Sequence, residues 1–334
     1  MATLSSFLIF CLLNTSLLLL CLVSGSYGEF PRYEHPIKEG DSLKFLVVGD
    51  WGRRGSSNQI LVADQMGKIG EKLDPDFVIS AGDNFYDNGL KSVDDPAFKE
   101  SFMNIYTAPS LQKQWYLVLG NHDYKGDVEA QLSPMLQKLD SRWLCLKSYI
   151  VDAEIVDIFF IDTTPFVENV LTEPGAHTYD WRGLASRKDY IPKYLEELKT
   201  VLKESDAKWK IVVGHHTLRS AGQHRDTREL VEQLLPILEE NSVDLYINGH
   251  DHCLQHITST TKRDGRLEFV TSGGGSKAWN NDIQKDKEGL EFYHDGQGFI
   301  SVELTPTVTK IDFYDVFGQV MYHFNMEKNN SSIQ

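Results

Sequence analysis

The sequence predicts an α/β protein with one large domain, in which strands and helices alternate first and strands dominate later. Short apolar runs, typical of buried strands, alternate with segments of helical apolar spacing as far as about residue 252. Beyond that point, short runs of alternating apolar and polar residues follow one another between turns. A chain of 334 residues can bury a large core, and no repeat, low-complexity tract or clear linker divides it.

The expected elements follow in order from residue 43. Apolar strands are predicted at 43–48, 76–81, 115–119, 156–162, 209–213 and 243–247. Helices are predicted between them, at 58–73, 98–106, 128–139, 190–204 and 228–241. Prolines and glycine predict an irregular loop at about 165–180. The later strands are predicted at 267–271, 299–304, 310–314 and 320–324.

The first 28 residues predict a secretory signal peptide. They carry no charged side chain, and an apolar run from 7 to 23 is followed by small residues before Gly28. A membrane anchor is the alternative, but this run is barely long enough to span a bilayer and no basic flank follows it. We therefore expect a signal peptide at 1–28, an N-terminal lead at 29–42, a single domain at 43–328 and a tail at 329–334.

Charge and cysteine content limit the environment and the partners of the protein. A net charge of −15 disfavours nucleic acid as a partner, because its phosphates would be repelled. Cys145 and Cys253 remain after signal cleavage, and the sequence leaves open whether they pair or stay as buried thiols. Asn329 and Asn330 begin overlapping glycosylation sequons, which fits a secreted protein without a membrane span.

Five predicted strands end in glycine followed by side chains that can bind metal ions. The segments are Gly49-Asp50, Gly82-Asp83, Gly120-Asn121-His122-Asp123, Gly214-His215-His216 and Gly249-His250-Asp251-His252. Open α/β sheets place ligand sites at the carboxyl ends of strands, so these ends are expected to meet at one edge. Tyr86 follows Asp83 closely enough to direct its phenol there. A single ending of this kind predicts only a turn, but five predict a shared site.

Carboxylates and imidazoles gathered so closely predict a binuclear metal site. Without a cation between them, like charges would repel one another. Oxygen donors mixed with imidazole suit first-row transition ions, and seven or eight donors exceed what one ion needs. Two ions about 3.5–4 Å apart that share one carboxylate can clamp a phosphoryl group and supply a hydroxide.

The order of these segments resembles the five motifs of the purple acid phosphatases, within the calcineurin-like metallophosphoesterases. The matching segments are Gly49 to Gly52, Gly82 to Tyr86, Gly120 to Asp123, Val212 to His215 and Gly249 to His252. Gly-Asn-His-Asp resembles the small mammalian-type monomers, and Asp50-Trp51-Gly52 resembles the low-molecular-weight plant members. The resemblance implies a four-layer αββα sandwich of two mixed β-sheets flanked by helices, and a monomer.

The resemblance also implies which residues hold the metals. The ligands of Fe(III) correspond here to Asp50, Tyr86, His252 and the bridging Asp83. The ligands of the second ion, a divalent Fe, Zn or Mn, correspond to Asn121, His215, His250 and the same bridge. Carboxylates with a phenolate favour a trivalent ion, whereas a neutral amide and imidazoles suit a divalent one. The Tyr86 phenolate on Fe(III) would give a purple colour.

His122 and His224 are the candidate catalytic residues. The resemblance places both beside the substrate phosphate, together with Asn121, and implies that one of them protonates the leaving alcohol. From its sequence context alone, His224 could equally be a solvated loop side chain. His216 is expected to be a spacer or to support a ligand, and His256 to be structural. We expect the carboxylates that follow ligands, Asp123 and Asp251, to orient neighbouring imidazoles.

The implied reaction is hydrolysis of small phosphate monoesters to an alcohol and orthophosphate, by in-line attack of a hydroxide that the metals hold. The resemblance implies an acidic pH optimum, and the signal peptide suggests secretion to the apoplast or cell wall, or delivery to the vacuole. A role in phosphate scavenging and a peroxidase-like side activity at iron are further expectations.

Alternatives to this function remain open from the sequence. Calcineurin-like phosphodiesterases and protein Ser/Thr phosphatases carry histidine near the first aspartate and lack the tyrosine, whereas this chain has Trp51 and Tyr86. An inactive binding protein of the same fold would be expected to lack a ligand, and none is missing. A loop near 165–180 covers the site and restrains activity in mammalian-type relatives, although its sequence differs here.

Overall fold

The computed structural model describes residues 30–37, 42–168, 178–184, 186–260, 266–279 and 283–328. The predicted signal peptide, both predicted glycosylation sites and the middle of the predicted loop (169–177) lie outside these residues. Within the described part of the chain, no helix combines the length and the apolar character needed to cross a bilayer.

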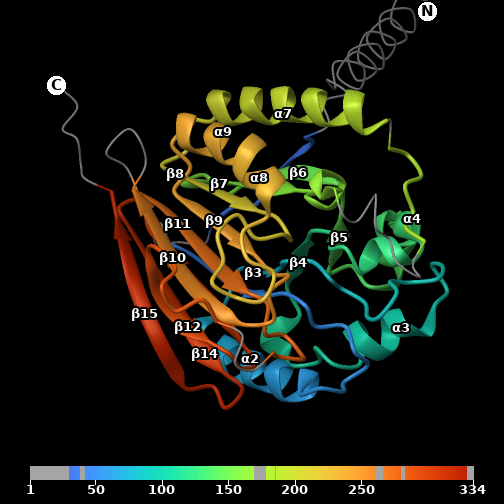
Figure 1. Ribbon diagram of the computed structural model, residues 1–334. Coiled ribbons are helices and arrows are strands. Elements are labelled where there is room, and N and C mark those ends of the chain that lie inside the picture. The colour runs from blue at the N-terminus through green and yellow to red at the C-terminus, as the bar shows by residue number, and fades with distance from the viewer. Residues whose placement is uncertain are drawn as a thin grey trace, which may run out of the picture.

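Two β-sheets lie at the centre of the molecule (Figure 1). The seven-stranded sheet has the strand order β15-β14-β13-β2-β3-β4-β5. In chain order its strands are β2 (Leu43–Val48), β3 (Phe77–Ser80), β4 (Gln114–Leu117), β5 (Trp143–Cys145), β13 (Gly298–Leu304), β14 (Val308–Asp315) and β15 (Val320–Glu327). The sheet is mixed, because β2 to β5 pair in parallel while β13 to β15 join them in antiparallel pairs.

The eight-stranded sheet has the strand order β1-β6-β7-β8-β9-β11-β10-β12. In chain order its strands are β1 (Arg32–Glu34), β6 (Ser148–Asp152), β7 (Val156–Ile161), β8 (Trp209–Val213), β9 (Leu245–Asn248), β10 (Leu254–Thr260), β11 (Arg266–Ser272) and β12 (Leu290–His294). Strands β7, β8, β9 and β11 pair in parallel, whereas β6, β10 and β12 add antiparallel pairs. Each sheet therefore has a parallel centre, whose strands end at the same edge.

Helices cover the outer face of each sheet, which gives the four layers that the sequence resemblance implied (Figure 1). The seven-stranded sheet packs against α2 (Gln59–Leu73), α3 (Pro96–Phe98), α4 (Val128–Leu132) and α5 (Pro134–Leu139). The eight-stranded sheet packs against α7 (Arg187–Glu204), α8 (Arg228–Gln233) and α9 (Leu235–Glu240). Both outer layers are held by buried apolar side chains, so the predicted four-layer fold is confirmed.

The central strands are apolar along their whole length because both of their faces are buried. In β2, Phe45 and Val47 point into the core between the two sheets, while Leu46 and Val48 pack against the outer helices. In β8, Ile211 and Val213 join the same central core, and Val212 points to the outer one. The central core therefore binds the two sheets into one unit, with the strand ends of both sheets at a common seam.

Proline divides two of the predicted helices into shorter ones. The predicted helix 128–139 is split at Ser133-Pro134, since a residue before proline is disfavoured in the helical region and Ser133 has extended angles. The predicted helix 228–241 is likewise divided into α8 and α9, with Pro236 in the first turn of α9. In place of the predicted helix 98–106, α3 (Pro96–Phe98) leads directly into a π-helix at Lys99–Met103, so the helical segment begins and ends earlier than predicted.

Several strands were not predicted because they are short or carry many polar residues. They are β1, β5, β6, β10 and β12. Strand β1 lies in the segment expected to be an N-terminal lead, and it pairs in parallel with β6 at the edge of the eight-stranded sheet. The salt bridge from Arg32 to the buried Asp157 fixes this edge strand to β7.

Candidate metal centre

The proposed metal ligands follow parallel strands from both sheets. Asp50 follows β2, Asp83 and Tyr86 follow β3, and Asn121 follows β4 in the seven-stranded sheet. His215 follows β8, and His250 and His252 follow β9 in the eight-stranded sheet. The structure brings all seven together at the seam, which is the arrangement expected where parallel strands end.

Three of these residues have an unusual backbone conformation. Asp50, Asp83 and His250 have φ angles of 60°, 51° and 70°, in the left-handed region that costs a residue with a Cβ atom about 1 kcal/mol or more. The hydrogen bond from the His250 amide to Asp50 Oδ2 (2.9 Å) and that from the His122 amide to Asp83 Oδ1 (2.8 Å) stabilise these turns. The loops therefore fix one another, and the side chains converge.

One group of donors gathers around the phenol of Tyr86. Its Oη lies 2.8 Å from Asp50 Oδ1 and 2.8 Å from Asp83 Oδ2. The Nε2 atom of His252 lies 3.1 Å from the same oxygen. Two carboxylates, a phenol and an imidazole thus present their donor atoms to one small space.

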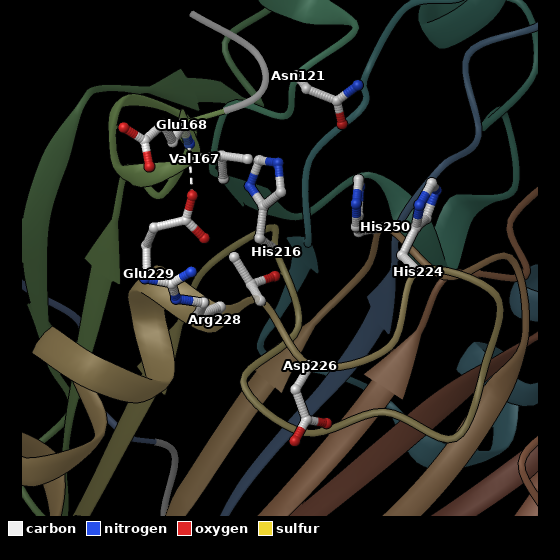
Figure 2. A pocket seen from close by; sticks show the side chains of 10 residues that line it. Asn121, Val167, Glu168, His216, His224, Asp226, Arg228, Glu229 and His250 are labelled. Atoms are coloured by element: carbon white, nitrogen blue, oxygen red, sulfur yellow. Dashed lines mark hydrogen bonds between the residues drawn. The ribbon is translucent and has the colours of Figure 1, made fainter. Parts of the chain in front are cut away.

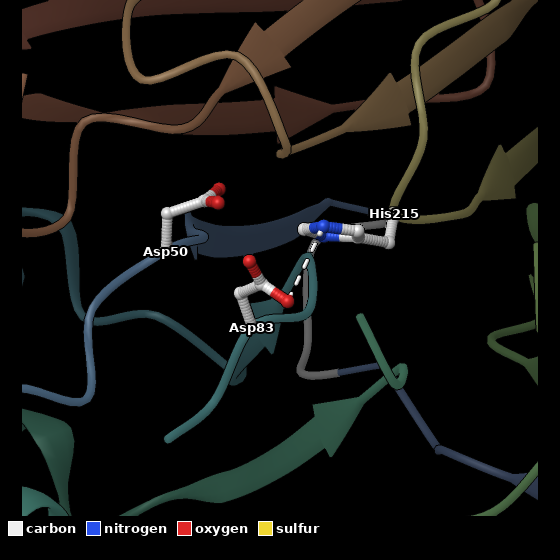
Figure 3. Close-up of side chains that lie close together, drawn as sticks. All are labelled: Asp50, Asp83 and His215. Carbon is white, nitrogen blue, oxygen red and sulfur yellow. Dashed lines mark ion pairs between the residues drawn. The ribbon is translucent and has the colours of Figure 1, made fainter. Parts of the chain in front are cut away.

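A second group gathers around the imidazole of His215. Its Nε2 atom faces Asp83 Oδ1 (Figure 3). The two atoms are 3.4 Å apart, and Asn121 Oδ1 lies 3.2 Å from the same nitrogen. The Nδ1 atom of His250 lies 3.3 Å from it. Asp83 therefore belongs to both groups, one carboxylate oxygen facing each, which is the position of a bridging ligand.

The tautomer of His215 favours metal binding. Its Nδ1 atom lies 2.9 Å from the carbonyl oxygen of Ala81. A carbonyl can only accept, so Nδ1 carries the hydrogen and the neutral ring keeps its lone pair on Nε2. Such a bond to the distal nitrogen is the usual way in which a protein orients a histidine ligand.

The ionisation of the cluster also fits a cation. Burial and the neighbouring Asp83 raise the pKa of Asp50 well above its usual value. Burial opposes ionisation of Asp83 too, but His215, His122 and the Tyr86 hydroxyl together bring its pKa below the usual range. Burial lowers the pKa of His252 to about 3 and that of His250 well below 6.5. The neutral imidazoles offer lone pairs to a metal ion, and the two carboxylates lie close enough to repel each other when both are ionised. Bound metal ions would remove that repulsion.

Glycines allow the loops that carry the ligands to lie in close contact with one another. Gly82 has φ of 89°, and a Cβ atom there would lie 2.6 Å from His215 Nδ1. A Cβ atom at Gly120 would lie 2.2 Å from Asp83 Oδ1. The glycine at each strand end therefore serves the close contact of two ligands as well as the turn.

The two candidate catalytic histidines lie on either side of the centre. The His122 ring is 4.5 Å from the Tyr86 ring, and its Nδ1 lies 2.5 Å from the carbonyl oxygen of Asp87. The His224 ring stacks on His250, with 4.0 Å between ring centroids. Both line one cavity of about 360 Å³ that also contains Tyr86, Asn121, His250 and His252 among its walls.

A second cavity, of about 590 Å³, adjoins the first (Figure 2). It shares Asn121, His224 and His250 with the first cavity, and its outer wall contains Glu168, Asp226, Arg228 and Glu229. Val167 and Glu168 belong to the start of the predicted loop 165–180, so this end of the loop lies near the centre.

The carboxylates next to ligands accept hydrogen bonds from backbone amides of the neighbouring loops. Asp123 accepts hydrogen bonds from the amides of Gly120 (2.8 Å), Asn84 (3.0 Å) and Phe85 (3.1 Å), and so joins the loops after β3 and β4. Asp251 accepts one from the amide of His224 at 2.8 Å. Both therefore position ligand-bearing loops through the main chain.

The remaining candidates are structural. His256 bonds to Glu268 (2.9 Å) and stacks on Phe324, as expected. His216 is buried, and its Nδ1 lies 2.9 Å from Thr163 Oγ1. Cys145 and Cys253 are both buried free thiols, which answers the question of a disulfide.

Two side chains that support the centre were not identified from the sequence. The Arg53 guanidinium lies 3.6 Å above the centroid of the Tyr86 ring. Trp279 stacks on His252 with 4.0 Å between centroids, and its ring edge meets His224. Arg53 directly follows the first motif, and Trp279 comes shortly after three consecutive glycines. Closeness to these features in the sequence could have suggested that both side chains lie near the centre.

Comparison with known proteins places this site in a family. A family model for calcineurin-like phosphoesterases matches residues 43–254. Purple acid phosphatase 17 of Arabidopsis thaliana is 58% identical over 318 residues, and the match covers 93% of both chains. Tartrate-resistant acid phosphatase type 5 of Sus scrofa is 29% identical over 87% of this chain and 88% of its own. A solved structure described as GAP50, the anchor in the inner membrane complex of Plasmodium, has a TM-score of 0.71 at 26% identity, covering 86% of this chain and 89% of that one.

The fold and the match to the family model define this chain as a calcineurin-like phosphoesterase. Its high identity to the plant proteins, over nearly its whole length, shows that it belongs to the purple acid phosphatases within that class.

Proposed function

We propose that this chain hydrolyses small phosphate monoesters to an alcohol and orthophosphate at a centre of Fe(III) and a divalent Fe, Zn or Mn ion. The observation that carries the proposal is the division of the donors into two groups that share Asp83. Tyr86 lies 2.8 Å from this carboxylate on one side, and His215 lies 3.4 Å from it on the other. Family membership supports the reaction class.

Each ion would have its own set of ligands. Fe(III) would be held by Asp50, Asp83, Tyr86 and His252. The divalent ion would be held by Asp83, Asn121, His215 and His250. When bound, the two ions would supply the attacking hydroxide and neutralise charge on the phosphoryl oxygens. The phenol and carboxylates of the first set suit a trivalent ion, and the amide and imidazoles of the second suit a divalent ion.

The histidines beside the centre would hold the phosphate and move a proton. Both nitrogens of His122 have neighbours, the Asp87 carbonyl oxygen at 2.5 Å and Lys125 Nζ at 3.5 Å, so this ring is held in place. The His224 ring is exposed and packs between His250 and Trp279. We assign His224 as the proton donor to the leaving alcohol and His122 as a positioning contact to the phosphoryl oxygens.

The cellular setting is proposed on sequence grounds. Uncharged apolar residues at 1–28 support cleavage of a signal peptide and secretion to the apoplast or cell wall, or delivery to the vacuole. The sequons at Asn329 and Asn330 support glycosylation on that route. We further propose that the predicted domain 43–328, with β1 added to its eight-stranded sheet, forms a single unit that acts as a monomer.

Metal analysis combined with a visible absorption spectrum tests the proposal. We expect two metal ions per chain, at least one of them iron, and a broad absorption band that Tyr86→Phe abolishes while the protein still folds. Turnover of p-nitrophenyl phosphate by the wild type should far exceed that of Asp83→Ala. Equal turnover by the two proteins would contradict the proposed function.

A specific observation separates the rival metallophosphoesterases from this proposal. Trp51, which takes the place of their histidine, is fully buried and its Nε1 donates to Ser80 Oγ at 2.8 Å. It packs against aromatic core residues and offers no metal ligand. A colourless active enzyme with bis-p-nitrophenyl phosphate as its better substrate would favour the phosphodiesterase alternative. An inactive protein that still binds both ions would favour a binding role.

A further inference from the structure

Positively charged side chains surround one side of the proposed centre. Arg53, Lys125 and Lys277 line the 360 Å³ cavity together with Tyr86 and His122. We call these three residues the cationic wall. The chain as a whole carries a net charge of −15, so its average composition does not account for three cations at one cavity.

Lys125 is directed at the substrate side of the centre. The Asp87 carbonyl oxygen lies 2.5 Å from His122 Nδ1, so this nitrogen carries a hydrogen and Nε2 is the other ring nitrogen. The Lys125 ammonium lies 3.5 Å from that Nε2 atom. Within the described part of the chain, no carboxylate lies within ion-pair distance of Lys125. Burial lowers its pKa from the ordinary value of 10.5, although the charges of Asp83 and Asp87 both raise it, which shows that its charge is held there at a cost.

Arg53 is fixed in place beside Lys125. Its Nε donates to Ser276 Oγ at 3.1 Å, and its Nη1 pairs with Asp87 at 3.0 Å. The plane of the guanidinium covers the ring of Tyr86 at 3.6 Å. Lys277 follows Ser276 directly, has an exposed side chain and makes no ion pair within the described residues. Asp83 also lines this cavity and attracts Lys125, and bound metal ions would offset its charge. With Asp87 paired to Arg53, the wall would then retain two positive charges, on Lys125 and Lys277.

The neighbouring 590 Å³ cavity is more acidic. Glu168, Asp226 and Glu229 lie in its wall, with Arg228 as the one Lys or Arg among the residues that line it (Figure 2). Asp226 is paired with Arg219 at 2.8 Å and with Lys287 at 2.5 Å, so the acidic character of this wall comes from Glu168 and Glu229. The bound metal ions would already neutralise the reacting phosphate, so the two charges of the cationic wall remain for another anion. Only the cationic side can accept such a group without repulsion.

We propose that the cationic wall binds a second anionic group of the substrate. This inference rests on the proposed phosphatase function and names its substrate class. The favoured substrates are phosphate esters whose leaving group carries a phosphoryl or carboxylate group within a few atoms of the scissile bond. The wall would orient them with the second anion beside Arg53, Lys125 and Lys277, away from Glu168 and Glu229.

A matched series of substrates tests the inference on the metal-loaded enzyme. The series consists of propyl phosphate, 3-(phosphonooxy)propionate and propane-1,3-diol bisphosphate, which differ only in the group at the far end. We expect kcat/KM to be about tenfold higher or more for the two substrates with a second anion, because one favourable charge contact of 1.4 kcal/mol corresponds to a factor of ten. The two arms distinguish a carboxylate from a phosphoryl group, and preference for either supports the inference.

Substitutions then assign the preference to the wall. In the double variant Lys125→Gln/Lys277→Gln, the preference ratio should fall to about one, through KM more than through kcat. Lys125→Arg should retain it. The matched control is Lys138→Gln, an exposed lysine on α5, which should leave the ratio unchanged. If the double variant fails to fold, Lys277→Gln alone should still lower the ratio, since that side chain is exposed.

Binding of a matched pair of non-hydrolysable phosphonates tests the inference without measuring turnover. Calorimetric titration should show tighter binding of 3-phosphonopropionate than of propylphosphonate, by about tenfold. The difference should vanish in the double variant and shrink at high ionic strength. If the wild type binds the two phosphonates equally tightly, or if the double variant still prefers 3-phosphonopropionate, the inference is overturned while the phosphatase function stands. Failure to hydrolyse propyl phosphate at all would instead count against the proposed function itself.

Discussion

The two sheets contribute different chemistry to the candidate centre. The loops of the seven-stranded sheet supply every proposed oxygen ligand: Asp50, Asp83, Tyr86 and Asn121. The loops of the eight-stranded sheet supply every proposed imidazole ligand: His215, His250 and His252. Neither sheet carries a complete set for either ion.

This division means that the site exists only when the sheets are packed together. His252 must reach the Tyr86 group, and Asn121 must reach the His215 group, across the seam. Two ions bound there would join the sheets in addition to the central apolar core. Metal binding and the packing of the two sheets should therefore stabilise each other.

The largest effect is expected from removing the ligand common to both groups. Asp83→Ala should lower kcat/KM for p-nitrophenyl phosphate by about 10⁴-fold, because both ions lose a ligand. Metal analysis of the purified variant should show that both ions are depleted. The control Asp94→Ala removes an exposed carboxylate and should leave activity unchanged. Retention of a full metal content by Asp83→Ala would mean that this residue does not bridge.

Metal removal should weaken the packing of the two sheets. Ions bound at 1,000 times their dissociation constant stabilise the folded state by about 4 kcal/mol, so the metal-free protein should melt at a lower temperature. Differential scanning calorimetry before and after chelation, followed by readdition of iron and zinc, measures this. An unchanged melting temperature would show that the seam does not depend on the ions.

Removing one imidazole should separate the two ions. His250→Gln should reduce kcat by about 10²- to 10³-fold by weakening the divalent site, while Tyr86 keeps the visible band of the iron. Tyr86→Phe should have the opposite outcome, with the divalent ion kept and the band lost. Metal content and absorbance measured on both variants check the division. Loss of colour in His250→Gln would show that the two groups are not independent.

The smallest effect concerns a carboxylate that directly follows β7 and contacts the segment after β4. Asp162 is buried and accepts a hydrogen bond from Tyr124, and burial raises its pKa to about 6. The folded state therefore holds the Asp162 proton more tightly than the unfolded state, whose pKa is near 3.8. The free energy of unfolding should fall by up to about 3 kcal/mol as pH rises from 4 to 6 on account of this group.

Asp162→Asn should remove that part of the pH dependence. Urea unfolding at pH 4, 5, 6 and 7 measures it, with Asp286→Asn as the exposed control. A slope between pH 4 and 6 that is the same in the wild type and in Asp162→Asn would contradict this expectation.

The strands that carry ligands could be predicted from the sequence because their signal is local. Strands β2 and β8 have the predicted bounds, since a strand buried on both faces is a continuous apolar run. The glycine that follows each strand was likewise visible, and the structure shows the close approach at Gly82 and Gly120 that requires it. Strands such as β10 and β12 were missed because their polar residues give no comparable pattern.

The sequence by itself determined the fold class and the list of donors, since both depend on residue types at short spacing. The resemblance implied which donors serve which ion, but only the tertiary structure brings them into contact, because His215 meets Asp83 from more than a hundred positions away on the side opposite Tyr86. The same holds for the cationic wall, whose members at positions 53, 125 and 277 share no local pattern. Side chains distant in the chain become neighbours only when two sheets pack on one core, and no local spacing encodes that packing.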